Sequence, residues 1–152
     1  MSKFEKCITN QNDIYLYFEI IKQIQPQKVL DVGMFLKRMG AVSRQAVNSE
    51  VGSEVELYGV DFMGDCRVEV YEQVYDVIED MPEFMMKVKE GWNEEFDLAW
   101  MLHTADSGLD DNSEKILWKW LSEHTDYAVV DKEGFRRNMW IISRYGFKSL
   151  QD

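Results

Sequence analysis

The chain has 152 residues, of which 45% are hydrophobic and 13% aromatic, so it is long enough for one domain with a packed core and is not expected to be disordered. Its 17 basic and 28 acidic side chains leave a formal net charge of −11. Because nucleic acids and anionic lipids are bound mainly through Lys and Arg, this balance argues against both as partners. We expect a single domain over residues 1–152, with residues 1–25 as an N-terminal helix packed on the core.

Cysteine and histidine usage gives no sign of a metal centre. The chain has two cysteines and two histidines, and none of them falls in a CxxC or CxxH pattern. We therefore predict no metal site and reduced thiols. The first residues lack the apolar segment of a signal peptide, and no apolar run is long enough to span a bilayer. A soluble, cytoplasmic protein is expected.

Apolar periodicity predicts helices and strands that alternate along the chain. Side chains at three- and four-residue intervals predict a helix over residues 13–24, which Pro26 ends. Further helices are predicted at about residues 39–48, 68–74, 82–90, 113–124 and 134–144, with Asp111 and Asn112 capping the fourth of these. Strands are predicted at residues 28–33, 54–61, 75–80, 96–102, 127–131 and 146–150.

This alternation predicts an α/β fold with a doubly wound, mainly parallel sheet of about six strands and helices on both faces. Ligands of such sheets bind at the carboxyl ends of the strands, where this chain places acids. Asp31 and Gly33 end the first strand, Asp61 the second and Asp80 the third. An acid can accept hydrogen bonds from the ribose hydroxyls or from the adenine amino group, and a glycine lets the backbone approach a ligand closely. The pattern therefore favours an adenosine-containing ligand.

Four segments carry a resemblance to the class I S-adenosylmethionine-dependent methyltransferases, which have a Rossmann-like fold. They read VLDVG at 29–33, YGVD at 58–61, YDVIEDMP at 75–82 and FDLAWML at 96–102, and the resemblance covers about residues 26–150. It implies S-adenosylmethionine as cofactor and S-adenosylhomocysteine as product. It also implies that Asp31 orients the methionine end of the cofactor and that Asp61 holds the ribose.

The same resemblance extends to the adenine and to the methyl group. It implies that Asp80 and Met81 read the adenine, that Phe62 packs on its face, and that the residues from Leu102 to Thr104 border the methyl group. The chain departs from the family at the glycine-rich loop, which is degenerate here because bulky residues follow Gly33. An insertion of about three residues would make Gly40 the last glycine of the loop. The predicted cofactor-binding residues are thus Asp31, Gly33, Met34, Gly40, Asp61, Phe62, Asp80, Met81 and Leu102.

Each candidate residue also has a purely structural interpretation. Asp31 could cap the following helix, and Asp61 and Asp80 could be solvated turn residues at the ends of strands. His103 is the candidate catalytic residue, because it is the only imidazole near the predicted cleft. An ordinary loop position is the alternative for His103, since methyl transfer can proceed by proximity and alignment alone.

Three functions remain open from the sequence. The first is a S-adenosylmethionine-dependent methyltransferase acting on a small-molecule acceptor. The second is a catalytically inactive methyltransferase fold that serves as a binding or oligomerising module, with Trp140 and Tyr145 on a possible homodimer face. The third is a dinucleotide-dependent oxidoreductase, which the absence of a G-x-G-x-x-G motif disfavours.

Overall fold

The computed structural model describes residues 13–33, 38–62, 74–101, 109–131, 139–143 and 146–149. Its strands are β1 (Lys28–Val32), β2 (Glu56–Asp61), β3 (Val77–Asp80), β4 (Phe96–Met101), β5 (Thr125–Asp131), β6 (Met139–Ser143) and β7 (Gly146–Ser149). Its helices are α1 (Asp13–Ile24), α2 (Arg38–Glu50), α4 (Met81–Lys89) and α5 (Asp111–His124). Among the helices in the described residues, none combines the length and apolar composition that crossing a bilayer requires.

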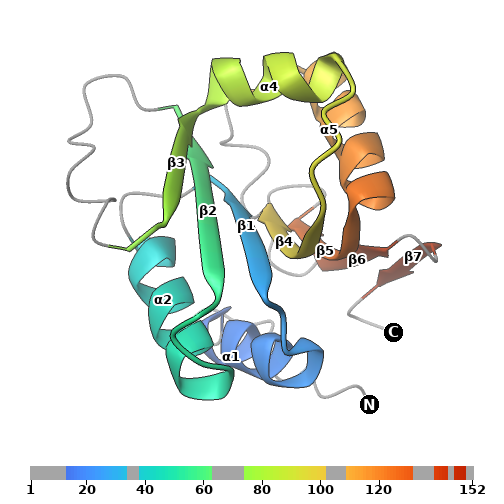
Figure 1. Ribbon diagram of the computed structural model, residues 1–152. Coiled ribbons are helices and arrows are strands. Elements are labelled where there is room, and N and C mark those ends of the chain that lie inside the picture. The colour runs from blue at the N-terminus through green and yellow to red at the C-terminus, as the bar shows by residue number, and fades with distance from the viewer. Residues whose placement is uncertain are drawn as a thin grey trace.

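The seven strands of the described residues form one sheet in the order β3-β2-β1-β4-β5-β6-β7. Neighbours among β1 to β5 are parallel, whereas β6 is antiparallel to β5 and to β7. Helices α1 and α2 lie on one face of the sheet, and α4 and α5 lie on the other (Figure 1). The predicted doubly wound α/β fold with a mainly parallel sheet is confirmed.

One predicted helix is wrong. A helix is predicted at about residues 134–144, but Met139–Ser143 is strand β6, which brings the described sheet to seven strands. The run Trp140-Ile141-Ile142 is aromatic and β-branched, and such residues favour strands. Only two residues separate β6 from β7, which suits an antiparallel hairpin rather than a helix followed by a strand.

Several element ends also differ from the prediction, among them the starts of β2 and β5, and two differences have a visible cause. Strand β3 begins at Val77 rather than at residue 75. Just before it, Asp76 donates its backbone N–H to the Leu57 carbonyl of β2, and its carboxylate accepts a hydrogen bond from the Leu57 N–H. Helix α5 is capped by Asp110, whose carboxylate accepts the Ser113 N–H at 2.7 Å, and not by Asp111 or Asn112. The predicted helix at 68–74 lies outside the described residues, except for residue 74.

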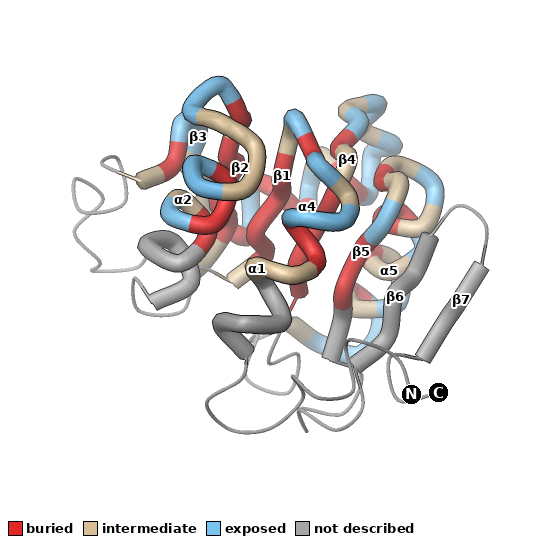
Figure 2. The backbone as a smooth tube through the Cα atoms, turned by 90° about the horizontal axis from the view of Figure 1, so that it is seen from below, coloured by how far each residue is buried: buried red, intermediate tan, exposed pale blue. Residues whose placement is uncertain are grey.

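The core has two halves, one on each face of the sheet. Side chains of α1 and α2 pack on one face against Val29, Leu57 and Leu98, among others. The α4 and α5 side is rich in aromatic side chains, and there the Trp92 and Trp120 rings stack at 5.6 Å. Figure 2 shows buried residues concentrated in the central strands. Because side chains alternate along a strand, each central strand contributes to both halves.

Candidate functional site

The three predicted acids lie on the same face of the sheet. Each acid stands an even number of residues after a core residue of its own strand. Asp31 is two residues after Val29, and Asp80 is two after Ile78. Asp61 is two residues after Gly59 and four after Leu57. Val29, Leu57 and Ile78 all belong to the core half under α1 and α2, so alternation places the acids on that side. Asp61 and Asp80 are direct register partners on neighbouring parallel strands. The sheet therefore brings these carboxylates to one edge.

The side chain of Glu79, which directly precedes Asp80 in β3, faces the opposite side of the sheet. Its carboxylate accepts a hydrogen bond from the Tyr58 hydroxyl at 2.9 Å and pairs with Lys87 of α4 at 2.5 Å. Burial, followed by the hydrogen bond and the charge of Glu79, raises the pKa of Tyr58 well above its ordinary value. These groups close the aromatic core under α4, so Glu79 has a structural role while Asp80 belongs to the other face.

Asp31 is a buried carboxylate held by two hydroxyl groups. It is 1% exposed, and its Oδ2 accepts hydrogen bonds from Ser43 Oγ at 2.6 Å and from the Tyr75 hydroxyl at 2.9 Å. Ser43 comes from α2, and Tyr75 precedes β3. The interpretation of Asp31 as a helix cap stays a prediction, since residues 34–37, between Gly33 and the first described residue of α2, lie outside the described residues. Neither Ser43 nor Tyr75 was singled out from the sequence.

An arginine on α2 fixes the segment that carries Tyr75. Arg44 donates to the Val74 carbonyl at 2.8 Å and to the Asp76 carboxylate at 3.0 Å, on either side of Tyr75. Burial alone would raise the pKa of Asp76, but the hydrogen bonds from the Leu57 N–H and from Arg44 outweigh it and hold the pKa below its ordinary value. The chain before β3 is thus tied both to α2 and to β2.

Gly33 has the backbone conformation that a glycine permits and other residues resist. Its φ is +87°, and a Cβ at this position would meet nothing within 4 Å. Its N–H donates to the Val60 carbonyl at 2.6 Å, which places it beside Asp61 at the edge of the sheet. Gly40 lies within the first turn of α2, and Met34 lies outside the described residues.

The other predicted site residues differ in exposure. Phe62 is 42% exposed, and its N–H donates to Asp61 Oδ1 at 2.8 Å. Asp80 occupies the N-cap position of α4 but makes no side-chain cap hydrogen bond. Met81 is 1% exposed and packs in the core half under α4 and α5. Leu102, His103 and Thr104 lie outside the described residues, so the roles predicted for these site residues remain predictions.

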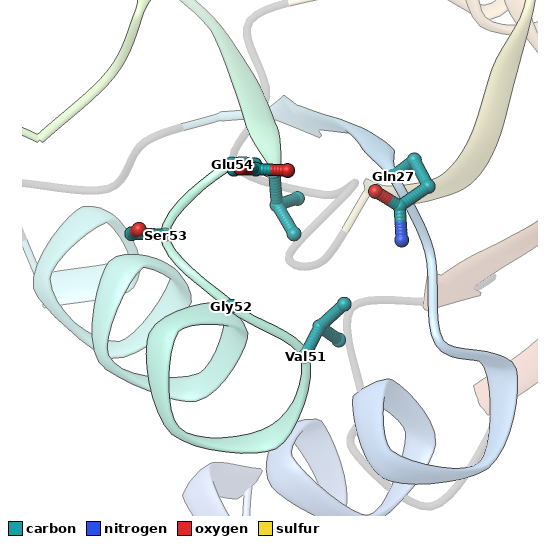
Figure 3. A pocket seen from close by; sticks show the side chains of 6 residues that line it. Gln27, Val51, Gly52, Ser53 and Glu54 are labelled. Carbon is teal, nitrogen blue, oxygen red and sulfur yellow. The ribbon is translucent and has the colours of Figure 1, made fainter.

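A surface hollow of about 350 Å³ lies at the opposite edge of the sheet, where β1 and β2 begin. The loop from α2 to β2 forms one side of it, with Val51, Gly52 and Ser53, and Gln27 lies on the other side (Figure 3). Among the described residues that line it, Glu54 alone is charged. Parallel sheets of this kind bind ligands at the carboxyl ends of their strands, so the acid-bearing edge is the better candidate site. Within the described ranges, no three or more His, Cys, Asp or Glu side chains are grouped to hold a metal ion.

Comparison by sequence finds no matching family model and no matching curated protein. Comparison of structures finds methyltransferases. A protein assigned as an O-methyltransferase from Klebsiella pneumoniae matches with a TM-score of 0.55 and 13% identity over 81% of this chain and 56% of its own. The O-methyltransferase of Bacillus cereus, solved with S-adenosylhomocysteine, gives 0.52 and 11% over 83% and 60%.

A third structure is covered more fully. The O-methyltransferase TomG from Streptomyces achromogenes, solved with S-adenosylmethionine, matches with a TM-score of 0.52 and 12% identity over 93% of this chain and 78% of its own. The chain nevertheless spans only 56–60% of the length of three O-methyltransferase-type structures that it matches. At this level of identity the likeness concerns the fold. This chain has the Rossmann-like fold of the S-adenosylmethionine-dependent methyltransferases.

Proposed function

We propose that the chain binds S-adenosylmethionine at the carboxyl ends of β1, β2 and β3 and methylates a small acceptor. The observation that carries the proposal is the placement of Asp31, Asp61 and Asp80 on one face of three adjacent parallel strands, with Gly33 beside Asp61. The matched structures support it, because several of them were solved with the cofactor or its product.

The residues present fit this cofactor. The open space around Gly33 would let a ligand approach the backbone closely. Asp61 would accept the two ribose hydroxyls, Asp80 would accept from the adenine amino group, and Asp31 would face the methionine end. The cofactor carries a sulfonium and an ammonium group, and nearby carboxylates stabilise both cations.

When bound, S-adenosylmethionine supplies a methyl group on a positively charged sulfur, activated for transfer to a nucleophile. The residues of the chain would bind the cofactor and align its methyl group with the acceptor. Holding both reactants in line can supply about 7–11 kcal/mol of the barrier without an acid or a base. His103 keeps its predicted role as the candidate base for removing the acceptor's proton.

Binding of the cofactor tests the proposal directly. Isothermal titration of the chain with S-adenosylmethionine and with S-adenosylhomocysteine should show saturable binding of both. Asp61→Ala should weaken both by about tenfold or more, because hydrogen bonds to a charged acceptor contribute about 1.5–3 kcal/mol. Glu54→Gln is the matched control, since Glu54 is exposed and lies just before the other end of the same strand. Absence of binding by the unmodified chain at millimolar ligand would refute the proposal.

The burial of Asp31 favours one alternative, a methyltransferase fold that serves as a binding or oligomerising module without turnover. A carboxylate that is 1% exposed and bonded to two protein hydroxyls is suited to a structural role. Light scattering coupled to size exclusion, run beside the titrations, separates the two functions. A stable homodimer with no affinity for either ligand would support the module.

A further inference from the structure

The carboxylate of Asp31 is held by side-chain hydrogen bonds, which the position of the residue near the end of a strand does not by itself require. A buried charge is costly unless hydrogen bonds compensate it, and here two hydroxyls do so. Both donate to the same oxygen, Oδ2, from different directions: Ser43 from α2 and Tyr75 from the segment before β3. Two donors on one oxygen fix the plane of the carboxylate and the direction of its other oxygen.

The neighbours of Asp31 within the sheet are unequal in size. In register, Trp100 of β4 lies on one side and Gly59 of β2 on the other. Trp100 is 2% exposed and belongs to the core half on the same face, so it fills the β4 side. Gly59 adds no side chain on the β2 side, which is the strand that ends at Asp61. No side chain of β2 therefore lies directly beside the Asp31 carboxylate, and the Tyr75 hydroxyl reaches it from the segment before β3.

Tyr75 is itself held in place. Arg44 binds the residues before and after it, Val74 through the carbonyl and Asp76 through the carboxylate. Asp76 is tied in turn to the Leu57 N–H at 2.8 Å. Tyr75 is 3% exposed, so packing restricts its ring as well. A tyrosine anchored on both sides loses little further freedom when it donates its hydroxyl.

We propose that Ser43 and Tyr75 are positioning residues, whose hydroxyl groups orient Asp31 to receive the ammonium group at the methionine end of the cofactor. This inference rests on the proposed function and adds two residues to it. They act through Asp31 and do not touch the ligand. Removing either hydroxyl should therefore weaken the binding of only those ligands that carry the amino acid end.

Two nucleoside ligands distinguish this role from a general structural one. S-adenosylhomocysteine carries the amino acid end, whereas 5′-methylthioadenosine has the same adenosine and sulfur without it. Isothermal titration of both ligands is compared for the unmodified chain, Tyr75→Phe and Ser43→Ala. The controls are Tyr127→Phe, because Tyr127 is 37% exposed on β5, and Ser49→Ala on the exposed side of α2. Circular dichroism checks that every variant is folded.

Tyr75→Phe and Ser43→Ala should each raise the Kd of S-adenosylhomocysteine about tenfold, as expected for a misdirected charged hydrogen bond, and leave that of 5′-methylthioadenosine unchanged. Both controls should bind both ligands as the unmodified chain does. Equal weakening of the two ligands would overturn the proposal in favour of a structural role, and so would no weakening of either. If the unmodified chain binds 5′-methylthioadenosine as tightly as S-adenosylhomocysteine, Asp31 does not receive the methionine end, and this inference fails while binding of the nucleoside stands. If it binds neither, the proposed function fails as well.

Discussion

Substitution of Gly33 by alanine probes the backbone at the centre of the candidate site. The φ of +87° lies in the left-handed region, where an L-residue with a Cβ costs about 1–2 kcal/mol. A Cβ there would meet no heavy atom within 4 Å, so no steric cost is added in the free protein. The reduced freedom of alanine in the unfolded chain offsets about 0.4–1 kcal/mol of this cost. We expect a net destabilisation of about 1 kcal/mol.

Gly91 provides a matched control at a distance from the candidate site. It follows α4, has a φ of +82°, and a Cβ there would likewise meet nothing within 4 Å. Gly91→Ala should therefore be destabilised as much as Gly33→Ala. In a domain of this size, 1 kcal/mol corresponds to a fall in Tm of about 2–4 °C, which differential scanning calorimetry resolves.

The two variants should differ in ligand binding. A methyl group on residue 33 would occupy space that the cofactor is proposed to approach, and overpacking typically costs about 1–3 kcal/mol. Gly33→Ala should thus bind S-adenosylhomocysteine at least about tenfold more weakly, whereas Gly91→Ala should bind it normally. An unchanged Tm for Gly33→Ala would refute the backbone reasoning. A lowered Tm with an unchanged Kd would remove Gly33 from the site.

Two further predictions concern stability. Asp76 has a lowered pKa in the folded chain, so its ionised form stabilises the fold above about pH 4 and this contribution is lost as the pH falls through the folded pKa. Asp76→Asn should lower the free energy of unfolding at pH 7 by less than about 1 kcal/mol, because the side chain is half exposed. A difference from the unmodified chain that persisted at about pH 2 would contradict the electrostatic reasoning. Phe84 is fully buried and packs edge-on against both Trp92 and Trp120, so Phe84→Ala should lower the free energy of unfolding in urea by about 3–5 kcal/mol. Met86→Ala on the same helix, at a side chain 62% exposed, should change stability by less than about 0.5 kcal/mol, and similar losses for both would refute the assigned packing.

Local patterns in the sequence were sufficient to predict most of the elements. The apolar spacing over Asp13–Ile24 predicted α1 with the bounds that the structure shows. The compact apolar runs of β1, β2 and β4 were also recognised, since strands buried on both faces are continuous in hydrophobicity. The predicted helix at 134–144 was wrong because strand propensity and the short connection to β7 outweighed the helical spacing.

Only part of the candidate site could be predicted from the sequence. The acids at the ends of β1, β2 and β3 were found because strand-end position is a local property of the sequence. The hydroxyls that hold Asp31 were missed because Ser43 is 12 residues away and Tyr75 is 44 residues away along the chain. Contacts of this kind depend on the order of the strands and on the pairing of α2 with β2, which no spacing rule supplies. Tyr75 was instead predicted to lie in the third strand, so its hydroxyl was not recognised as a partner of Asp31.

One face of the sheet is rich in packed aromatic side chains, and the other carries the acids of the proposed cofactor site. The α4 and α5 side holds the aromatic side chains, and Tyr58, Glu79 and Lys87 bond to one another there. The α1 and α2 side holds the buried Asp31 and faces the carboxylates of Asp61 and Asp80. Strands with a period of two let one sequence meet both demands, because changing a residue on one face leaves its neighbours on the other in place. Substitutions under α4 should therefore lower stability without altering ligand selectivity, whereas removing the hydroxyls around Asp31 should alter selectivity first.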